Sequence, residues 1–140
     1  MPWLVTEMGT PTERQETTDY AVKRIDENLT PERYNVALLL AFIYVSIRLR
    51  SLLTDHITPS KPMWKETHRV LGSLGFRSLL KHCKEFRLIT KEEGDKLSKL
   101  ADKRNYIAHE SVLWRSLTDA DIANIKEHCE FAKTFLRSHS

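Results

Sequence analysis

The feature that most constrains the fold of this chain is an apolar run over residues 36–47, in which every residue but one is hydrophobic. A threonine–proline pair at positions 30 and 31 precedes the run and supplies a helix start. A helix from there to about Leu53 would be apolar on almost all sides, so we expect other segments to cover it at the centre of the fold. The run is shorter than the roughly 20 residues that a membrane span needs, and Arg48 and Arg50 follow it. We therefore expect no membrane partner.

Other helix starts are marked by capping signals. Threonines followed by a proline or an acidic residue begin helices at Thr10, Thr90 and Thr118. Prolines at 59 and 62 interrupt the chain, and two glycines separate further helical stretches over 63–71 and 76–86. No stretch shows the polar–apolar alternation of a half-buried strand. The sequence predicts an all-α fold, an up-and-down helical bundle of about five helices joined by short loops.

The size and composition of the chain fit one domain. Its 140 residues are 41% hydrophobic and 29% charged, which is enough for a core without disulfides. We assign residues 1–9 to an N-terminal tail and residues 10–140 to a single helical domain. The first residues lack the basic and apolar regions of a secretory signal, and two cysteines are too few for a disulfide framework. We expect a cytoplasmic protein.

Each of the two cysteines follows a histidine, at 82–83 and at 128–129. Neighbouring residues on a helix point about 100° apart, and no familiar zinc spacing connects the two pairs. Cys83 and Cys129 also fall on apolar helix stripes. We predict that both are core residues, and we expect no metal site and no cofactor.

The net charge of +3 is unevenly distributed. Residues 1–32 carry seven acidic and three basic side chains, which leaves a net charge of +7 on the rest of the chain. A basic bias of this size is compatible with an anionic partner such as RNA. Solvated helix faces explain the same numbers, so the charge alone does not select a function.

The segment 104–109 reads Arg-Asn-Tyr-Ile-Ala-His and lies on the helix that Thr90 begins. At about 100° per residue, Arg104 projects into an apolar sector formed by Leu97, Leu100, Ala101 and Ala108. A guanidinium in such a sector needs a partner or an opening. Arg104 is therefore expected either to pair with an acid such as Asp102 or Glu110, or to face a cleft.

Three side chains of this segment could act on a phosphodiester. Asn105 and His109 are four residues apart and share a helix face, whereas Arg104 and His109 diverge by about 140°. They could converge on one phosphate if the helix ends near His109 or if a second copy of the segment faces the first. Arginine offers a permanently charged fork for phosphate oxygens, and histidine exchanges protons near neutral pH. These are the parts needed to cleave RNA without a metal ion.

The arginine, the asparagine after it and the histidine resemble the Arg-x(4–6)-His signature of HEPN domains. The flanking order is similar to that family as well, with Leu-Gly-Phe-Arg-Ser-Leu-Leu at 74–80 and Leu-Ile-Thr at 88–90 before the motif. The likeness covers roughly residues 30–138, mostly as a pattern of helices.

The bare spacing of the signature occurs twice more. Arg50 pairs with His56 and Arg77 with His82 at acceptable distances along the chain. Both arginines are followed by serine, and neither pair reproduces the Arg-Asn start in the expected helix order. Context therefore selects the segment 104–109, and the other two pairs serve as controls.

The resemblance implies a metal-independent endoribonuclease. His109 would be the general base or acid, Arg104 would stabilise charge on the phosphoryl oxygens, and Asn105 would support them. The family also implies a homodimer whose two motifs share one cleft, and a role in toxin–antitoxin systems or defence. Ser111 stands where HEPN toxins that are silenced by nucleotidyltransferase antitoxins carry a tyrosine, so silencing through that tyrosine is not expected.

Two alternatives remain open at the level of sequence. The chain could be a non-catalytic helical module that binds RNA or a protein, with Arg104 and His109 serving structure only. It could also be an interaction subunit that pairs with a nucleotidyltransferase antitoxin through an apolar helix face.

Overall fold

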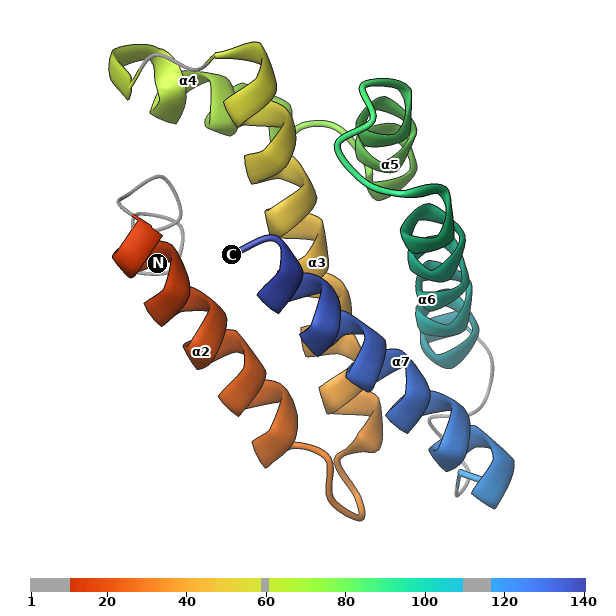
Figure 1. The fold of residues 1–140 in the computed structure, drawn as a ribbon. Coiled ribbons are helices and arrows are strands. Elements are labelled where there is room, and N and C mark those ends of the chain that lie inside the picture. Colours follow the sequence, from red (N-terminus) through yellow and green to blue (C-terminus); the bar gives the residue numbers. More distant parts are fainter. Residues whose placement is uncertain (1–10, 59–60, 110–116) are drawn as a thin grey trace.

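The structure is a computed structural model that describes residues 11–58, 61–109 and 117–140, with backbone only for 11–16, 61, 108 and 109. The proposed tail at 1–9 lies outside the described residues. The described residues form helices and no strands, which confirms the all-α class (Figure 1). The helices are α2 (Pro11–Glu27), α3 (Tyr34–Ile57), α4 (Lys61–Leu71), α5 (Phe76–Glu85), α6 (Lys91–His109) and α7 (Asp119–Ser138).

The described residues contain six helices rather than about five. The stretches expected to be helical at 63–71 and 76–86 are two separate helices, α4 and α5, divided by a turn at Gly72–Gly75. Gly75 has an extended backbone and precedes the first residue of α5. The glycines therefore end one helix and begin another.

Helix α3 is the centre of the fold, as the apolar run predicts. It contacts every other described helix, and α2, α7 and α6 lie next to one another around it (Figure 1). Its fully buried apolar side chains are Ala37, Leu38, Ala41, Val45, Leu49 and Leu53. At 24 residues, α3 is long and apolar enough to cross a membrane, with half of its most apolar window buried. A buried core helix meets the same criterion.

The observed helix starts can be compared with the capping signals in the sequence. The Thr90 hydroxyl accepts from the Glu93 N–H at 3.0 Å while the Glu93 carboxylate accepts from the Thr90 N–H, so the predicted capping box is confirmed. Thr118 caps α7 in the same way. The predicted start of α3 at positions 30 and 31 is wrong by about one turn. Glu32 has a φ of 75°, a left-handed conformation that a right-handed helix does not accommodate.

Arg48 joins three helices from inside the core. Only 1% of this residue is exposed. One terminal nitrogen, Nη1, donates to the carbonyl oxygens of Leu136 at 2.8 Å and His139 at 2.9 Å. The other, Nη2, donates to the Thr18 hydroxyl at 3.0 Å. Arg48 thereby satisfies carbonyl groups at the C-terminal end of α7, which have no partners within the helix.

We expect Arg48→Met to lower the free energy of unfolding by about 3 kcal/mol, since each buried acceptor left without a donor costs roughly 1–3 kcal/mol. Methionine fills similar space but donates no hydrogen bond. Urea denaturation followed by circular dichroism measures the change. Arg137→Met, at an exposed position of α7, is the control and should stay within about 0.5 kcal/mol of the parent. Equal stability of the two variants would contradict this role for Arg48.

Candidate functional site

A cleft with a volume of about 470 Å³ opens where α3, α5 and α6 meet. Helix α3 contributes one face, with Phe42, Ser46, Ile47 and Arg50. The turn at 72–75 and the first residues of α5 form a second wall, and α6 forms the third. Three arginines line it, namely Arg50, Arg77 and Arg104, and we call it the arginine cleft. The described residues that line it include no acidic side chain.

Arg104 faces this cleft from α6. Its guanidinium carbon lies 4.8 Å from the centre of the Phe42 ring, and its Nη1 donates to the Asn105 side-chain oxygen at 2.9 Å. Its Nε is buried and has no hydrogen-bond partner among the described residues. No described carboxylate forms an ion pair with it. The expected position of Arg104 in a cleft is thus observed.

The ion pair of Arg104 with Asp102, one of the alternatives considered, is not formed, because Asp102 binds Arg77 instead. Residues two apart on a helix point about 200° apart, so Arg104 and Asp102 lie on different sides of α6. The other acid considered, Glu110, lies outside the described residues.

Asn105 and Arg104, which are adjacent in the sequence, are joined by a side-chain hydrogen bond. Because the Asn105 oxygen accepts from Arg104, the amide fixes one end of the guanidinium without cancelling its charge. His109 is the last residue of α6, one turn beyond Asn105. Its side chain lies outside the described residues, so its place in the site stays a prediction.

Arg50 faces the cleft from α3 and is held by a neutral partner. Its Nε donates to His68 Nε2 at 3.2 Å. His68 is buried and stacks on Trp64, with ring centroids 4.6 Å apart. Burial, and secondarily the positive charge of Arg50, lower the pKa of His68 to about 4. At neutral pH the imidazole is therefore uncharged and Nε2 can accept the hydrogen bond.

Gly72 makes room for the Arg50 guanidinium. A Cβ at this position would lie 2.2 Å from Arg50 Nη1, far inside contact distance. The guanidinium therefore rests directly against the backbone of the turn. Burial also lowers the pKa of Arg50, as expected for a cation that has lost part of its water without gaining an anionic partner.

Arg77, in the first turn of α5, connects that helix to α6. Its Nη1 donates to the Ser98 hydroxyl at 2.6 Å, and its Nη2 pairs with Asp102. Both members of the pair are more than half exposed, so the pair adds little stability. Its effect is to position Arg77 at the mouth of the arginine cleft.

Sequence reasoning missed Arg50 and Arg77 as parts of the site. In the sequence, each of the two arginines matches only the bare arginine–histidine spacing. Their histidines do not line the cleft. His56 packs on Phe86, and His82 lies beside Glu85. The available signal for Arg50 was its spacing of four and eight residues from Ser46 and Phe42, which puts all three on one face of α3.

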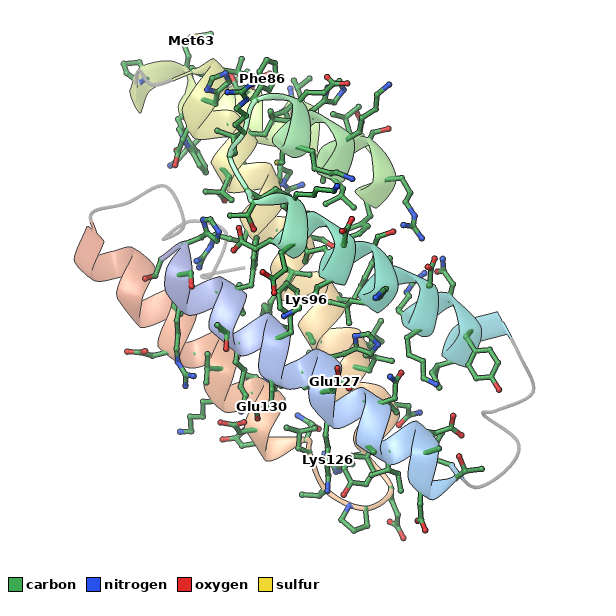
Figure 2. All side chains as sticks on the ribbon, turned by 45° about the vertical axis from the view of Figure 1, so that its right-hand side comes forward. Met63, Phe86, Lys96, Lys126, Glu127 and Glu130 are labelled. Carbon is green, nitrogen blue, oxygen red and sulfur yellow. The ribbon has the colours of Figure 1, made fainter. Side chains whose placement is uncertain are left out.

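A second cavity of about 330 Å³ lies between α6 and α7. Lys96 of α6 and Glu127 of α7 both line it, and both lie along this boundary in Figure 2. Lys96 already pairs with Glu92 at 3.2 Å, and Glu130 adds another acid to the lining. Positive and negative side chains thus balance here, and the cavity lacks the one-sided charge of the arginine cleft.

Both cysteines are buried and free, which confirms them as core residues. Burial raises the pKa of each thiol to about 12, so neither is a thiolate at neutral pH. Within the residues that the structure describes, no group of three or more histidine, cysteine or acidic side chains could hold a metal ion.

Comparison with known proteins adds no relative: no family model, no curated protein and no solved structure matches this chain.

The low pKa of His68 predicts a loss of stability in mild acid. Its folded pKa of about 4 lies below the ordinary value of 6.5, so between these values the unfolded chain binds more protons. Stability is therefore full above pH 6.5 and falls as the pH drops toward 4. Between about pH 7.5, which lies above this window, and about pH 5, which lies inside it, we expect the melting temperature of the parent to fall more than that of His68→Gln. Glutamine can accept from Arg50 but does not titrate, and equal falls would contradict the assignment.

Proposed function

We propose that the protein is a metal-independent endoribonuclease of the HEPN type and that the arginine cleft is its active site. The observation that carries the proposal is Arg104, a half-buried guanidinium that faces an open cleft and has no carboxylate partner among the described residues. An anion would stabilise that charge, and the planar fork of arginine matches the oxygens of a phosphodiester.

The proposed reaction needs only groups of RNA and of this chain. The 2′-oxygen attacks the neighbouring phosphorus, the bond from phosphorus to the 5′-oxygen breaks, and a 2′,3′-cyclic phosphate and a 5′-hydroxyl result. His109 removes the proton of the 2′-hydroxyl or supplies one to the leaving oxygen. Arg104 stabilises the charge on the phosphoryl oxygens, and Asn105 holds Arg104 in place.

The arrangement of helices supports the HEPN-type proposal. The motif occupies the last turns of a long helix that packs against a central apolar one. A homodimer would supply a second histidine for the other proton transfer. We propose RNA as the substrate, a second copy of the chain as the partner, the cytoplasm as the location, and toxin–antitoxin or other defence systems as the setting.

A non-catalytic RNA-binding module is the second candidate function. The three arginines of the cleft could hold a phosphate backbone with no help from His109. The two candidates differ in one respect only, which is whether the bound strand is cut.

We expect pure protein to cleave single-stranded RNA in the presence of EDTA, with 2′,3′-cyclic phosphate ends and no cleavage of DNA. His109→Ala should lower kcat by roughly 10²–10⁴-fold, the usual contribution of a positioned proton-transfer group. The matched control is His82→Ala, on the outer part of α5, which should leave kcat unchanged. Binding of RNA without cleavage by the parent would favour the second candidate.

Arg104→Lys tests the guanidinium separately from its charge. Lysine keeps the charge but has neither the planar fork nor the stacking on Phe42, so we expect kcat to fall by about 10²-fold. The melting temperature should change little, since no described carboxylate loses a partner. Arg137→Lys, at an exposed position, is the control. Full activity of Arg104→Lys would rule out a specific role for the guanidinium.

A further inference from the structure

We propose that Arg50 and the start of α5 form a second phosphate subsite, which binds a neighbouring phosphate of the RNA strand held at Arg104. The inference rests on the proposed function, because it assigns an additional part of the substrate to the same cleft. It adds residues that the Arg104–His109 motif does not contain.

The first observation is that the charge of Arg50 is not compensated. Its one hydrogen-bond partner among the described residues is His68, which is neutral at physiological pH. Its terminal nitrogens have no acceptor in the described part of the chain, although the residue is half-buried. A guanidinium held in place by a neutral group keeps its full charge for a ligand.

The second observation is that the position of Arg50 is fixed. His68 holds Nε on one side, while the turn at Gly72 lies against Nη1 on the other. His68 is itself fixed by stacking on Trp64 and by a 3.3 Å contact between Nε2 and the Ser51 hydroxyl. Less side-chain freedom is then lost when an anion binds, which favours affinity.

The third observation is a pair of phenyl rings in the lining of the cleft, beside Arg104. Phe42 contacts both Arg104 and Phe76, and the centroids of the two phenyl rings are 4.9 Å apart. Phe76 begins α5 and is followed by Arg77. Apolar rings beside the cations give the base or sugar of an RNA strand a surface to pack on.

The start of α5 adds to the positive potential at the second position. No side chain caps this ten-residue helix at Gly75, so the first N–H groups are left without intrahelical partners. Such groups, together with the helix dipole, favour an anion. Arg77 lies in the same turn.

The volume of the cleft is consistent with more than one phosphate. At about 470 Å³ it falls within the range of roughly 300–1,000 Å³ that holds small organic ligands. A single phosphate ion would leave most of this space to water. A segment of RNA with two successive phosphates, one at Arg104 and one at Arg50, would use more of the cleft.

The test measures binding of 2′-O-methyl RNA, which cannot be cleaved, by fluorescence anisotropy over a range of salt concentrations. We expect Arg50→Gln to weaken binding about tenfold and to reduce the salt slope by about 0.7, the value for one lost phosphate contact on a single strand. The parent should bind a trinucleotide with two phosphates better than a dinucleotide with one, and Arg50→Gln should lose that preference.

Two further variants separate position from charge. Gly72→Ala keeps the net charge but displaces the Arg50 guanidinium, so we expect the trinucleotide preference to fall as in Arg50→Gln. Arg137→Gln removes the same charge from an exposed place outside the cleft and should bind within about twofold of the parent, as surface substitutions usually do. Melting temperatures show that each variant is folded.

Parent-like salt slopes and trinucleotide preference in both Arg50→Gln and Gly72→Ala would overturn the second subsite. A different result would overturn the proposed function, namely that the parent protein does not cleave RNA. Binding of the uncleavable strands does not depend on that activity, so the two results are independent.

Discussion

The structure depends on covering α3, a helix that is apolar on almost all sides. Burying its apolar side chains requires helices on several sides, and it contacts α2, α4, α5, α6 and α7, while Val36, Leu39 and Ile43 stay exposed. The same helix carries two arginines, Arg48 and Arg50, whose side chains point about 200° apart. Arg48 turns into the core and binds the end of α7, whereas Arg50 turns into the cleft. The requirement that buries α3 thus also places one cation of the candidate site.

Neutral groups hold two of the three arginines in the cleft. Arg50 is bound by an uncharged imidazole, and Arg104 by an amide and the face of a phenyl ring. Neutral partners fix the geometry of a guanidinium but leave its charge available, whereas a carboxylate would cancel much of it. Among the described residues, Arg77 alone of the three has an acidic partner, at the exposed mouth of the cleft. This distribution is what a site for a phosphodiester requires.

Local features of the fold could be predicted from sequence, and long-range ones could not. The capping boxes at Thr90 and Thr118 join residues three positions apart, so both partners of each interaction can be identified from a short stretch of sequence. Arg48 instead binds carbonyl groups 88 and 91 residues away. Nothing near it in the sequence indicates that a charged residue there is buried.

The candidate site likewise has a local part that the sequence predicts and a long-range part that it does not. Helical periodicity placed Arg104 in an apolar sector and predicted a cleft or a partner, because both depend on one helix. The contributions of Arg50 and Arg77 depend on how α3 and α5 pack against α6, which spacing along the chain does not contain. The motif spacing pairs Arg50 with His56 and Arg77 with His82, and neither pairing indicates that the two arginines meet Arg104 in one cleft.

The central claim is that Arg104 is available to bind a phosphodiester. The most direct measurement is the NMR signal of its Nε–H group during titration with a 2′-O-methyl dinucleotide. We expect a saturable shift of the Arg104 signal, while the signal of the core residue Arg48 stays in place. An Arg104 signal that does not move up to millimolar dinucleotide would contradict the proposed role of Arg104.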